Sequence, residues 1–249
     1  MDAGSALLEY HDYVLANWRR SIRVPLLVMV ALGFGMIAIV EWVFPHHSFV
    51  AGAFLGGTEA ALLVTWTEPP HRVRKWKLGG EGERRTGREL ARLVSAGWKS
   101  YHSRAARYGD LDHVVIGPGG VYLLDSKNLD GALSVDARGL TQSFGDSERD
   151  SFTLSKLGNA LRGEAVNLRN RIEDVAGLRC WVQAVVVVWG DFNDSTTEVE
   201  NVVYVAGREL ESWMRARPKR LSDRDVSLLQ LGMESEDIVR RAPPLVPSM

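Results

Sequence analysis

Two aspartates and a lysine, Asp112, Asp125 and Lys127, lie on the two strands of a predicted β-hairpin. The sequence Gly-Pro-Gly-Gly at 117–120 separates two apolar, β-branched runs, which predicts a hairpin with a four-residue loop. If the residues that flank this loop face each other, Asp112 faces Asp125 across the pair of strands. Because side chains alternate along a strand, all three polar side chains then project from one face of the sheet.

This arrangement of charges favours a bound cation. Opposed residues of an antiparallel pair have Cβ atoms only about 4.5–5.5 Å apart, so two carboxylates repel unless a proton or a cation lies between them. Magnesium takes oxygen ligands from one or two carboxylates plus water, and the lysine would lie beside a phosphate or water bound there. These residues therefore predict a metal-dependent site that cleaves phosphodiesters. Asp110 shares the face of Asp112 and is an alternative to it, whereas His113 points the other way and is expected to pack or be partly exposed.

The hairpin residues carry a family resemblance. Residues 112–118 and 120–128 resemble the core of the nuclease-related domain, NERD, a family of the PD-(D/E)XK nuclease superfamily. The resemblance covers roughly residues 78–215 and implies a restriction-endonuclease-like core. In that superfamily an Asp, a later Asp/Glu-x-Lys and an upstream helical Glu form the site, and the matching positions are Asp112, Asp125-Ser126-Lys127 and Glu83.

The resemblance also implies a role for each of these residues. Asp112, Asp125 and the Ser126 carbonyl would hold Mg²⁺ or Mn²⁺, and the ion would lower the pKa of the attacking water. Lys127 would position that water or stabilise the charge that develops on the phosphate. Glu83 would orient a water at the ion.

Glu83 lies near the start of a helix predicted over Glu81–Trp98. Leu90, seven residues later, belongs to the inner stripe of that helix, so Glu83 is expected on the side of the sheet. The alternative is an ordinary first-turn glutamate that stabilises the helix dipole, and the local sequence alone favours it. The resemblance of Gly82-Glu83 to the helical Gly-Glu of the family favours the functional role. Four arginines on the outer face are either solvated or meet a phosphate backbone: Arg84, Arg85, Arg88 and Arg92.

Composition restricts the class of protein. The 249 residues allow one large domain, or one ordinary domain with an accessory segment. With 45% hydrophobic and 24% charged residues, the chain has the composition of a folded protein. A formal net charge of -1 argues against a strongly basic, histone-like binding mode but is compatible with a local basic face. The lone cysteine, Cys180, excludes an internal disulfide and a zinc site built from cysteine clusters.

The N-terminal part of the chain contains two apolar runs in a stretch without Lys or Arg between Arg23 and Arg72. Val24–Phe44 is almost continuously apolar and long enough for a membrane-spanning helix, which needs about 20 residues. Phe49–Trp66 is a second, shorter run after a turn at 45–48. A buried core helix is the alternative. Two adjacent runs bounded by cationic clusters favour a transmembrane hairpin, with both ends in the cytoplasm by the positive-inside rule.

The remaining periodicities predict an α/β fold, a mixed β-sheet flanked by helices and preceded by the two-helix hairpin. The predicted elements are strands at Lys99–Arg104, Gly131–Val135, Trp181–Trp189 and Asn201–Ala206, helices at Thr153–Val175, Gly207–Ala216 and Ser222–Gln230, and a polar loop at 136–150. The predicted domains are an amphipathic lead-in (1–23), the transmembrane hairpin (24–68), a basic linker (69–80), the nuclease-related domain (81–240) and a tail (241–249).

Two functions from different classes follow from this reading. The leading one is a membrane-tethered nuclease that cleaves nucleic acid, with DNA the expected partner and Mg²⁺ or Mn²⁺ the cofactor. The lipid bilayer is the second partner, through residues 24–68. The alternative is an inactive binding module that keeps the fold and holds nucleic acid or protein at the membrane. The presence of all the matching polar residues argues against a loss of catalytic activity. A transporter is a weaker third idea, because two short helices supply little pore.

Overall fold

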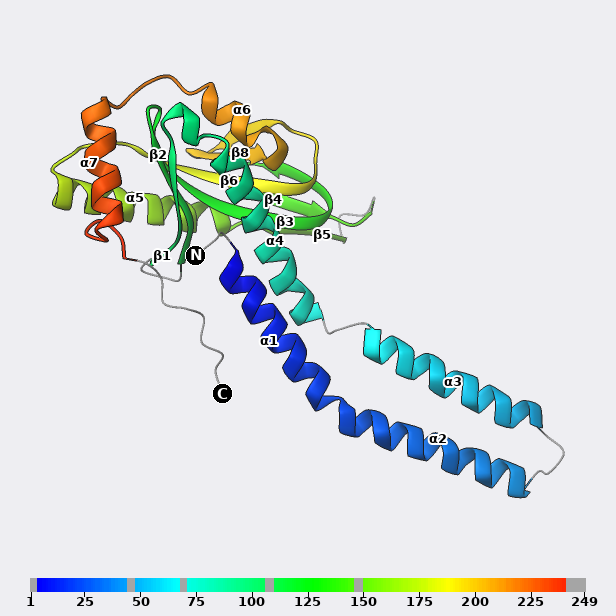
Figure 1. The fold of residues 1–249 in the computed structure, drawn as a ribbon. Coiled ribbons are helices and arrows are strands. Elements are labelled where there is room, and N and C mark those ends of the chain that lie inside the picture. Colours follow the sequence, from blue (N-terminus) through cyan, green and yellow to red (C-terminus); the bar gives the residue numbers. More distant parts are fainter. Residues whose placement is uncertain (1–3, 44–47, 68–70, 106–109, 146–149, 241–249) are drawn as a thin grey trace. The chain divides into compact units, whose positions relative to one another are not determined.

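The computed structural model describes residues 4–43, 48–67, 71–105, 110–145 and 150–240 (Figure 1). The chain forms two units: one is Glu9–Lys77, and the other joins Met1–Leu8 to Leu78–Met249. The predicted tail at 241–249 and nearly all of the predicted turn at 45–48 lie outside the described residues. The unit that joins both ends of the chain holds the predicted site.

A mixed sheet is the centre of that unit, which confirms the predicted fold class. Its main path runs in the order β1-β2-β3-β6-β8-β7, with β4 and β5 attached to β3. Strand β6 pairs in parallel with β3 and β8, whereas β1, β2 and β3 form an antiparallel meander. The strands are β1 (Lys99–Ala105), β2 (Asp110–Gly117), β3 (Gly120–Asp136), β4 (Gly139–Ser143), β5 (Ser151–Leu154), β6 (Val182–Phe192), β7 (Thr196–Val199) and β8 (Val202–Ala206).

Helices cover both faces of the sheet. The face with Val115 and Leu124 packs against α4 and α6, and the face with Val114 and Leu123 packs against α5 and α7. Both sides of β6 are therefore buried, which is why its sequence is a continuous valine run at 185–188 instead of an alternating pattern. The helices are α4 (His71–Ala91), α5 (Leu157–Ala176), α6 (Leu210–Arg215) and α7 (Asp223–Glu234), with short 3-10 turns η1 (Val94–Ala96) and η3 (Gly207–Glu209).

The β2–β3 hairpin has the predicted register. The residues that flank the turn pair with each other, and the ladder continues in step to His113 and Leu124. Asp112 and Asp125 are the next positions in this register, one step beyond the last pair. The two aspartates therefore lie where the strands stop pairing, not inside a continuous ladder.

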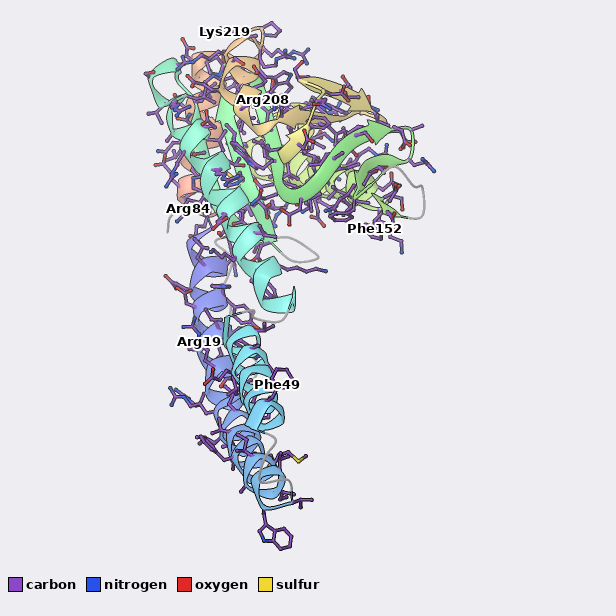
Figure 2. The ribbon with its side chains drawn as sticks, turned by 90° about the vertical axis from the view of Figure 1, so that its right-hand side faces the viewer. Arg19, Phe49, Arg84, Phe152, Arg208 and Lys219 are labelled. Atoms are coloured by element: carbon purple, nitrogen blue, oxygen red, sulfur yellow. The ribbon has the colours of Figure 1, made fainter. Side chains whose placement is uncertain are left out.

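The segment predicted as a polar loop at 136–150 contains β4, so that prediction is wrong. Strand β3 also continues through the separate strand predicted at Gly131–Val135. It bends there: Gly131 has a φ of +80°, and the register with β6 shifts between Asn128 and Ala132. The bend carries β4 and β5 away from the main path, where Phe152 is exposed (Figures 1 and 2). Because β4 pairs with its neighbours while remaining half solvated, its sequence lacks the apolar alternation that predicts a strand.

Helix α4 begins at His71 instead of near Glu81, so it occupies most of the segment predicted as a basic linker, 69–80. Glycines at 79, 80 and 82 each disfavour a helix by about 1 kcal/mol, which makes the sequence resemble a linker. The structure explains them by close contacts. A Cβ on Gly82 would lie 2.9 Å from the Cβ of Asn128 on β3, and one on Gly80 would lie 2.9 Å from Leu8 Cγ. Tertiary packing therefore overrides helix propensity here.

The other unit consists of α1 (Ser5–Ser21) without its first turn, α2 (Arg23–Val43), α3 (Ser48–Thr67) and the start of α4 as far as Lys77. Backbone hydrogen bonds continue through Ile22, so α1 and α2 form one bent helix (Figure 1). Pro25, which has no N–H to donate, is the physical reason for a bend there. Helix α3 packs against α2, where Gly33 lies against Thr58.

One helical stretch, Leu7–Val40, is long and apolar enough by composition to cross a membrane. The described part of the chain holds no second stretch that meets this condition. Most apolar side chains of α2 are exposed, including Leu27, Leu32 and Trp42. The two helices of the predicted hairpin are therefore present, while a crossing by both of them, and its topology, stay a prediction.

Leu93→Ala tests the face that packs under α4. The side chain of Leu93 is fully buried, so its truncation leaves a cavity and should lower the free energy of unfolding by about 2–5 kcal/mol. Arg88 is exposed on the outer side of α4, and Arg88→Ala should change that free energy by about 0.5 kcal/mol or less. Denaturant unfolding of the full-length protein in detergent measures both values. Equal losses would contradict the assignment of faces.

Candidate active site

The Asp112 carboxylate connects the ends of β2 and β3. Its Oδ2 accepts a hydrogen bond from the backbone N–H of Ser126 at 2.9 Å. In a continuous ladder, a backbone carbonyl of β2 would accept the hydrogen bond from such an N–H. Pairing between β2 and β3 ends at His113 and Leu124, so no carbonyl of β2 is paired with β3 at this point. The side chain of Asp112 therefore supplies the acceptor that β2 no longer offers, and it is held next to the following Asp-x-Lys segment.

Asp125 and Lys127 project from the same face of β3 and form an ion pair. The Lys127 ammonium donates to Asp125 Oδ1 at 2.9 Å and lies 2.7 Å from Oδ2. Burial alone would lower the pKa of Lys127, but the neighbouring carboxylates, led by Asp125, raise it. The lysine is thus fully charged and compensates part of the local negative charge.

Glu83 reaches this cluster from α4, although α4 packs on the opposite face of the sheet. Burial first, and then the negative charge of Asp125, raises the pKa of Glu83 to about 7, while Lys127 opposes this shift. Charges interact at this strength only when they are near each other. Glu83 therefore lies by the point where β2 and β3 separate, as the resemblance implied.

Asp112 is affected by the same accumulation of charge. Burial, followed by the charges of Asp125 and Glu83, raises the pKa of Asp112 well above its usual range. The Ser126 N–H and the ammonium of Lys127 oppose the shift but do not cancel it. The structure thus brings all the predicted catalytic residues together, with more negative than positive charge.

The donor atoms fit a hard divalent cation held by few protein ligands. Asp125 Oδ2 is buried and accepts no hydrogen bond, so its only described partner is the ion pair with Lys127. Within the described residues, no group of three His, Cys, Asp or Glu side chains is arranged to hold a metal ion. Mg²⁺ does not require such a group, because it binds one or two carboxylates and keeps several waters. Asp112, Asp125 and the Ser126 backbone carbonyl are the residues that would hold it.

The Ser126 side chain points away from the carboxylates into a buried chain of hydrogen bonds. Ser126 Oγ donates to Thr86 Oγ1 of α4 at 2.8 Å, and Trp189 Nε1 donates to the same oxygen at 2.9 Å. His113 Nε2 lies 3.2 Å from Ser126 Oγ, and His113 Nδ1 lies 2.7 Å from His102 Nδ1. Since the Ser126 hydroxyl proton is given to Thr86, the proton of neutral His113 is on Nε2. The chain fixes Ser126, whose N–H orients Asp112.

His113 is fully buried, so it packs inside the unit, one of the two environments expected for it. Burial first, and then the charge of His102, holds its pKa well below the usual range. Asp110, the alternative to Asp112, begins β2 and is exposed. Its carboxylate adds to the raised pKa of Glu83, so Asp110 also lies near the cluster. The hydrogen bond to Ser126 distinguishes Asp112 as the fixed member.

One contact to the site comes from the start of the chain, and no pattern in the sequence indicates it. The backbone N–H of Gly4 donates to the Glu83 carboxylate and partly offsets the rise of its pKa. Gly4 is buried with a φ of +71°, and an added Cβ would meet the carbonyl oxygen of Gly80. Only glycine fits such an approach. No local pattern could predict a contact across nearly eighty residues of sequence.

A cavity of about 340 Å³ opens beside the two aspartates on the face covered by α5. Asp112 and Asp125 line it from the sheet, and Asn159, Glu164 and Asn167 line it from α5. The carboxylates of the cluster therefore lie in a space that a ligand can enter.

The mixed sheet and the helices on both of its faces define an α/β domain. In agreement with this class, the sequence model of NERD, the nuclease-related domain, matches residues 78–189. The match indicates a nuclease-like fold for this part of the chain. The chain has no significant match among curated proteins or among solved structures.

The raised pKa of Glu83 predicts that the protein without metal loses stability as the pH rises. Folded Glu83 keeps its proton up to a pKa of about 7, whereas the ordinary value is 4.5. The folded state therefore binds more protons between these values, and the free energy of unfolding falls through this window, by roughly 3 kcal/mol at most. Unfolding of wild type and Glu83→Gln in EDTA should show a smaller slope for the variant. Equal slopes would contradict the placement of Glu83.

Gly4→Ala should destabilise the protein by about 1–3 kcal/mol, because alanine is strained at this φ and its Cβ overlaps Gly80. Gly163→Ala is the matched control. Gly163 lies in α5, and an added Cβ would meet nothing within 4 Å, so this change should stabilise the protein by about 0.5–1 kcal/mol. Thermal unfolding of both full-length variants gives opposite signs if the N-terminal segment packs as described. A neutral Gly4→Ala would contradict that packing.

Proposed function

We propose that this protein cleaves phosphodiester bonds of nucleic acid with the help of Mg²⁺ or Mn²⁺. The observation that carries the proposal is the convergence of Glu83, Asp112 and Asp125 on the charged Lys127, beside a cavity that Asp112 and Asp125 line. Purely structural ion pairs tend to balance their charges, whereas this cluster has more carboxylates than cations. Such an excess is suited to a metal and a phosphate.

Each residue has a defined task in this proposal. Asp112 and Asp125, with the Ser126 carbonyl, would hold the cation, which supplies Lewis-acid stabilisation of the phosphate when it is bound. Lys127, released from Asp125, would donate to a phosphate oxygen as negative charge develops there. Glu83, which lies close enough to Asp125 for their charges to interact, would orient a water at the ion.

The arginines of α4 give limited support for a nucleic acid substrate. Arg84 and Arg85 are exposed on this helix, and Figure 2 shows the position of Arg84. Arg92 forms an ion pair of 2.6 Å with Glu89. It therefore fits the alternative in which these arginines are solvated surface residues without a ligand. DNA is the first substrate to test.

We also propose that the α2–α3 pair anchors the protein in a membrane. The support is the apolar, exposed surface of the helical stretch Leu7–Val40 and the packing of α3 against α2. An exposed apolar surface of this extent is unfavourable in water and favourable in lipid. The Lys and Arg residues on both sides of the pair support a topology with both chain ends in the cytoplasm.

Asp125→Asn and Lys127→Ala should separate metal binding from chemistry. Asp125→Asn should abolish cleavage and weaken the stabilisation of the fold by Mg²⁺, because one of the ligands is lost. Lys127→Ala should abolish cleavage and keep that stabilisation, because the lysine serves the phosphate. Asp130→Asn, an exposed change on the same strand, is the control and should leave both unchanged. Cleavage of single- and double-stranded DNA and RNA, together with thermal unfolding with and without Mg²⁺ or Mn²⁺, measures the outcomes.

The inactive binding module predicts different results. It predicts no cleavage by wild type on any of these substrates, and nucleic acid or protein binding that Asp125→Asn does not change. A wild-type protein that neither cleaves nor responds to Mg²⁺ or Mn²⁺ would replace the nuclease proposal with this alternative.

The membrane proposal predicts the location of the C-terminus. A reporter that is active only in the cytoplasm should be active when fused after Met249, because an even number of crossings returns the chain to its starting side. The full-length protein should also float with lipid vesicles in a density gradient. Activity only of a reporter for the outside, or a protein that stays in the soluble fraction, would contradict the anchor.

A further inference from the structure

A second cavity lies at the turn end of the β2–β3 hairpin. It has a volume of about 390 Å³ and is lined from four parts of the chain: the hairpin turn, the start of β6, the strand β7 and the segment after α6. Tyr122 lines it and lies three residues before Asp125 on β3, which is about 10 Å along the strand. The cavity is therefore separate from the carboxylate cluster but belongs to the same unit.

Positive charge converges on this cavity. Arg179, Arg217 and Arg220 line it, against one carboxylate, that of Glu198. Arg179 is already paired with Glu173 at 2.6 Å. Arg217 and Arg220 remain as the cationic groups of the cavity, and both act on the phenol of Tyr122: burial raises its pKa, and the two guanidinium charges oppose that rise.

These two arginines are held in place before any ligand binds. The Arg217 guanidinium lies 4.5 Å from the ring of Trp213, and its Nε donates to the Trp213 carbonyl at 3.1 Å. Within the described residues, no hydrogen bond engages its terminal nitrogens. The backbone N–H of Arg220 donates to Pro118 O at 2.8 Å, which fixes Arg220 to the hairpin turn. The Arg217 guanidinium is therefore preorganised, which lowers the entropic cost of binding phosphate, and the backbone of Arg220 is held beside it.

Aromatic surface adjoins the two arginines. Trp181 lines the cavity and is 50% exposed, so part of its indole ring is accessible to a ligand. The rings of Tyr122 and Trp213 are 5.8 Å apart and form the wall beside it. Exposed tryptophan next to arginine is suited to an aromatic ring that carries a phosphate, since bases stack on indole and the phosphate pairs with guanidinium.

We infer that this cavity binds a nucleotide, with its phosphate at Arg217 and Arg220 and its base against Trp181. Glu198 fits a nucleotide better than a bare anion, because its carboxylate can accept a hydrogen bond from a base amino group or a sugar hydroxyl but repels a free phosphate. The nucleotide comes either from solution or from a nucleic acid strand. The inference does not depend on cleavage at the carboxylate cluster.

The test measures nucleotide binding to the full-length protein in detergent and EDTA, where a metal-dependent site cannot contribute. AMP, inorganic phosphate and a short single-stranded oligonucleotide are titrated by calorimetry. Arg220→Ala and Trp181→Ala should each weaken nucleotide binding by about tenfold or more. Arg224→Ala is the matched control: Arg224 is exposed on α7 outside the cavity, and its loss should leave binding unchanged. Both test positions are exposed, so neither change should prevent folding.

Each outcome decides the inference. Binding of AMP with this pattern of variants supports a site for a free nucleotide, and binding of the oligonucleotide alone with the same pattern supports a site for a nucleic acid strand. Phosphate that binds as tightly as AMP would overturn the role of the aromatic surface and leave only an anion site. No binding, or equal losses for Arg220→Ala and Arg224→Ala, would overturn the inference. None of these results depends on whether Asp125 supports cleavage, so the two proposals fail independently.

Discussion

The hydrogen bond from the Ser126 N–H to the Asp112 carboxylate, 2.9 Å long, is the contact on which the site depends. It forms where β2 and β3 stop pairing after His113 and Leu124. A continuous ladder would use the backbone of β2 as the acceptor and would leave no opening between the strands for Glu83 to approach from the other face. The end of the ladder therefore both fixes Asp112 and admits the third carboxylate.

The same geometry brings carboxylates close together, and the protein's own side chains and backbone compensate only part of their repulsion. Burial and mutual repulsion raise the pKa values of Glu83 and Asp112, and Lys127 compensates one charge by pairing with Asp125. Gly4 adds one backbone N–H to Glu83. A divalent cation would remove the remaining repulsion, so the cluster is better suited to a metal and a phosphate than to stability alone. The packing of the sheet offsets the free energy that this repulsion costs.

Much of the fold and of the site was predictable because its causes are local. The turn at 117–120 fixed the register, and the register placed Asp112 opposite Asp125. The prediction of Glu83 as a site residue depended on the family resemblance, because a glutamate in the first turn of a helix can also serve only to stabilise the helix dipole. Strand β4 escaped prediction because a paired but half-solvated strand lacks apolar alternation, and the start of α4 escaped because its glycines are explained only by packing. Contacts such as that of Gly4 arise from tertiary structure and have no local pattern.

The central claim is that the carboxylates at the end of the β2–β3 ladder hold a divalent cation. The most direct measurement is an experimental structure of the full-length protein with Mn²⁺, recorded with anomalous scattering. The account predicts a peak within ligand distance of both Asp112 and Asp125, with Lys127 displaced from Asp125. A map recorded at saturating Mn²⁺ that shows no peak at these carboxylates would contradict this claim, whether or not Mn²⁺ binds elsewhere in the crystal.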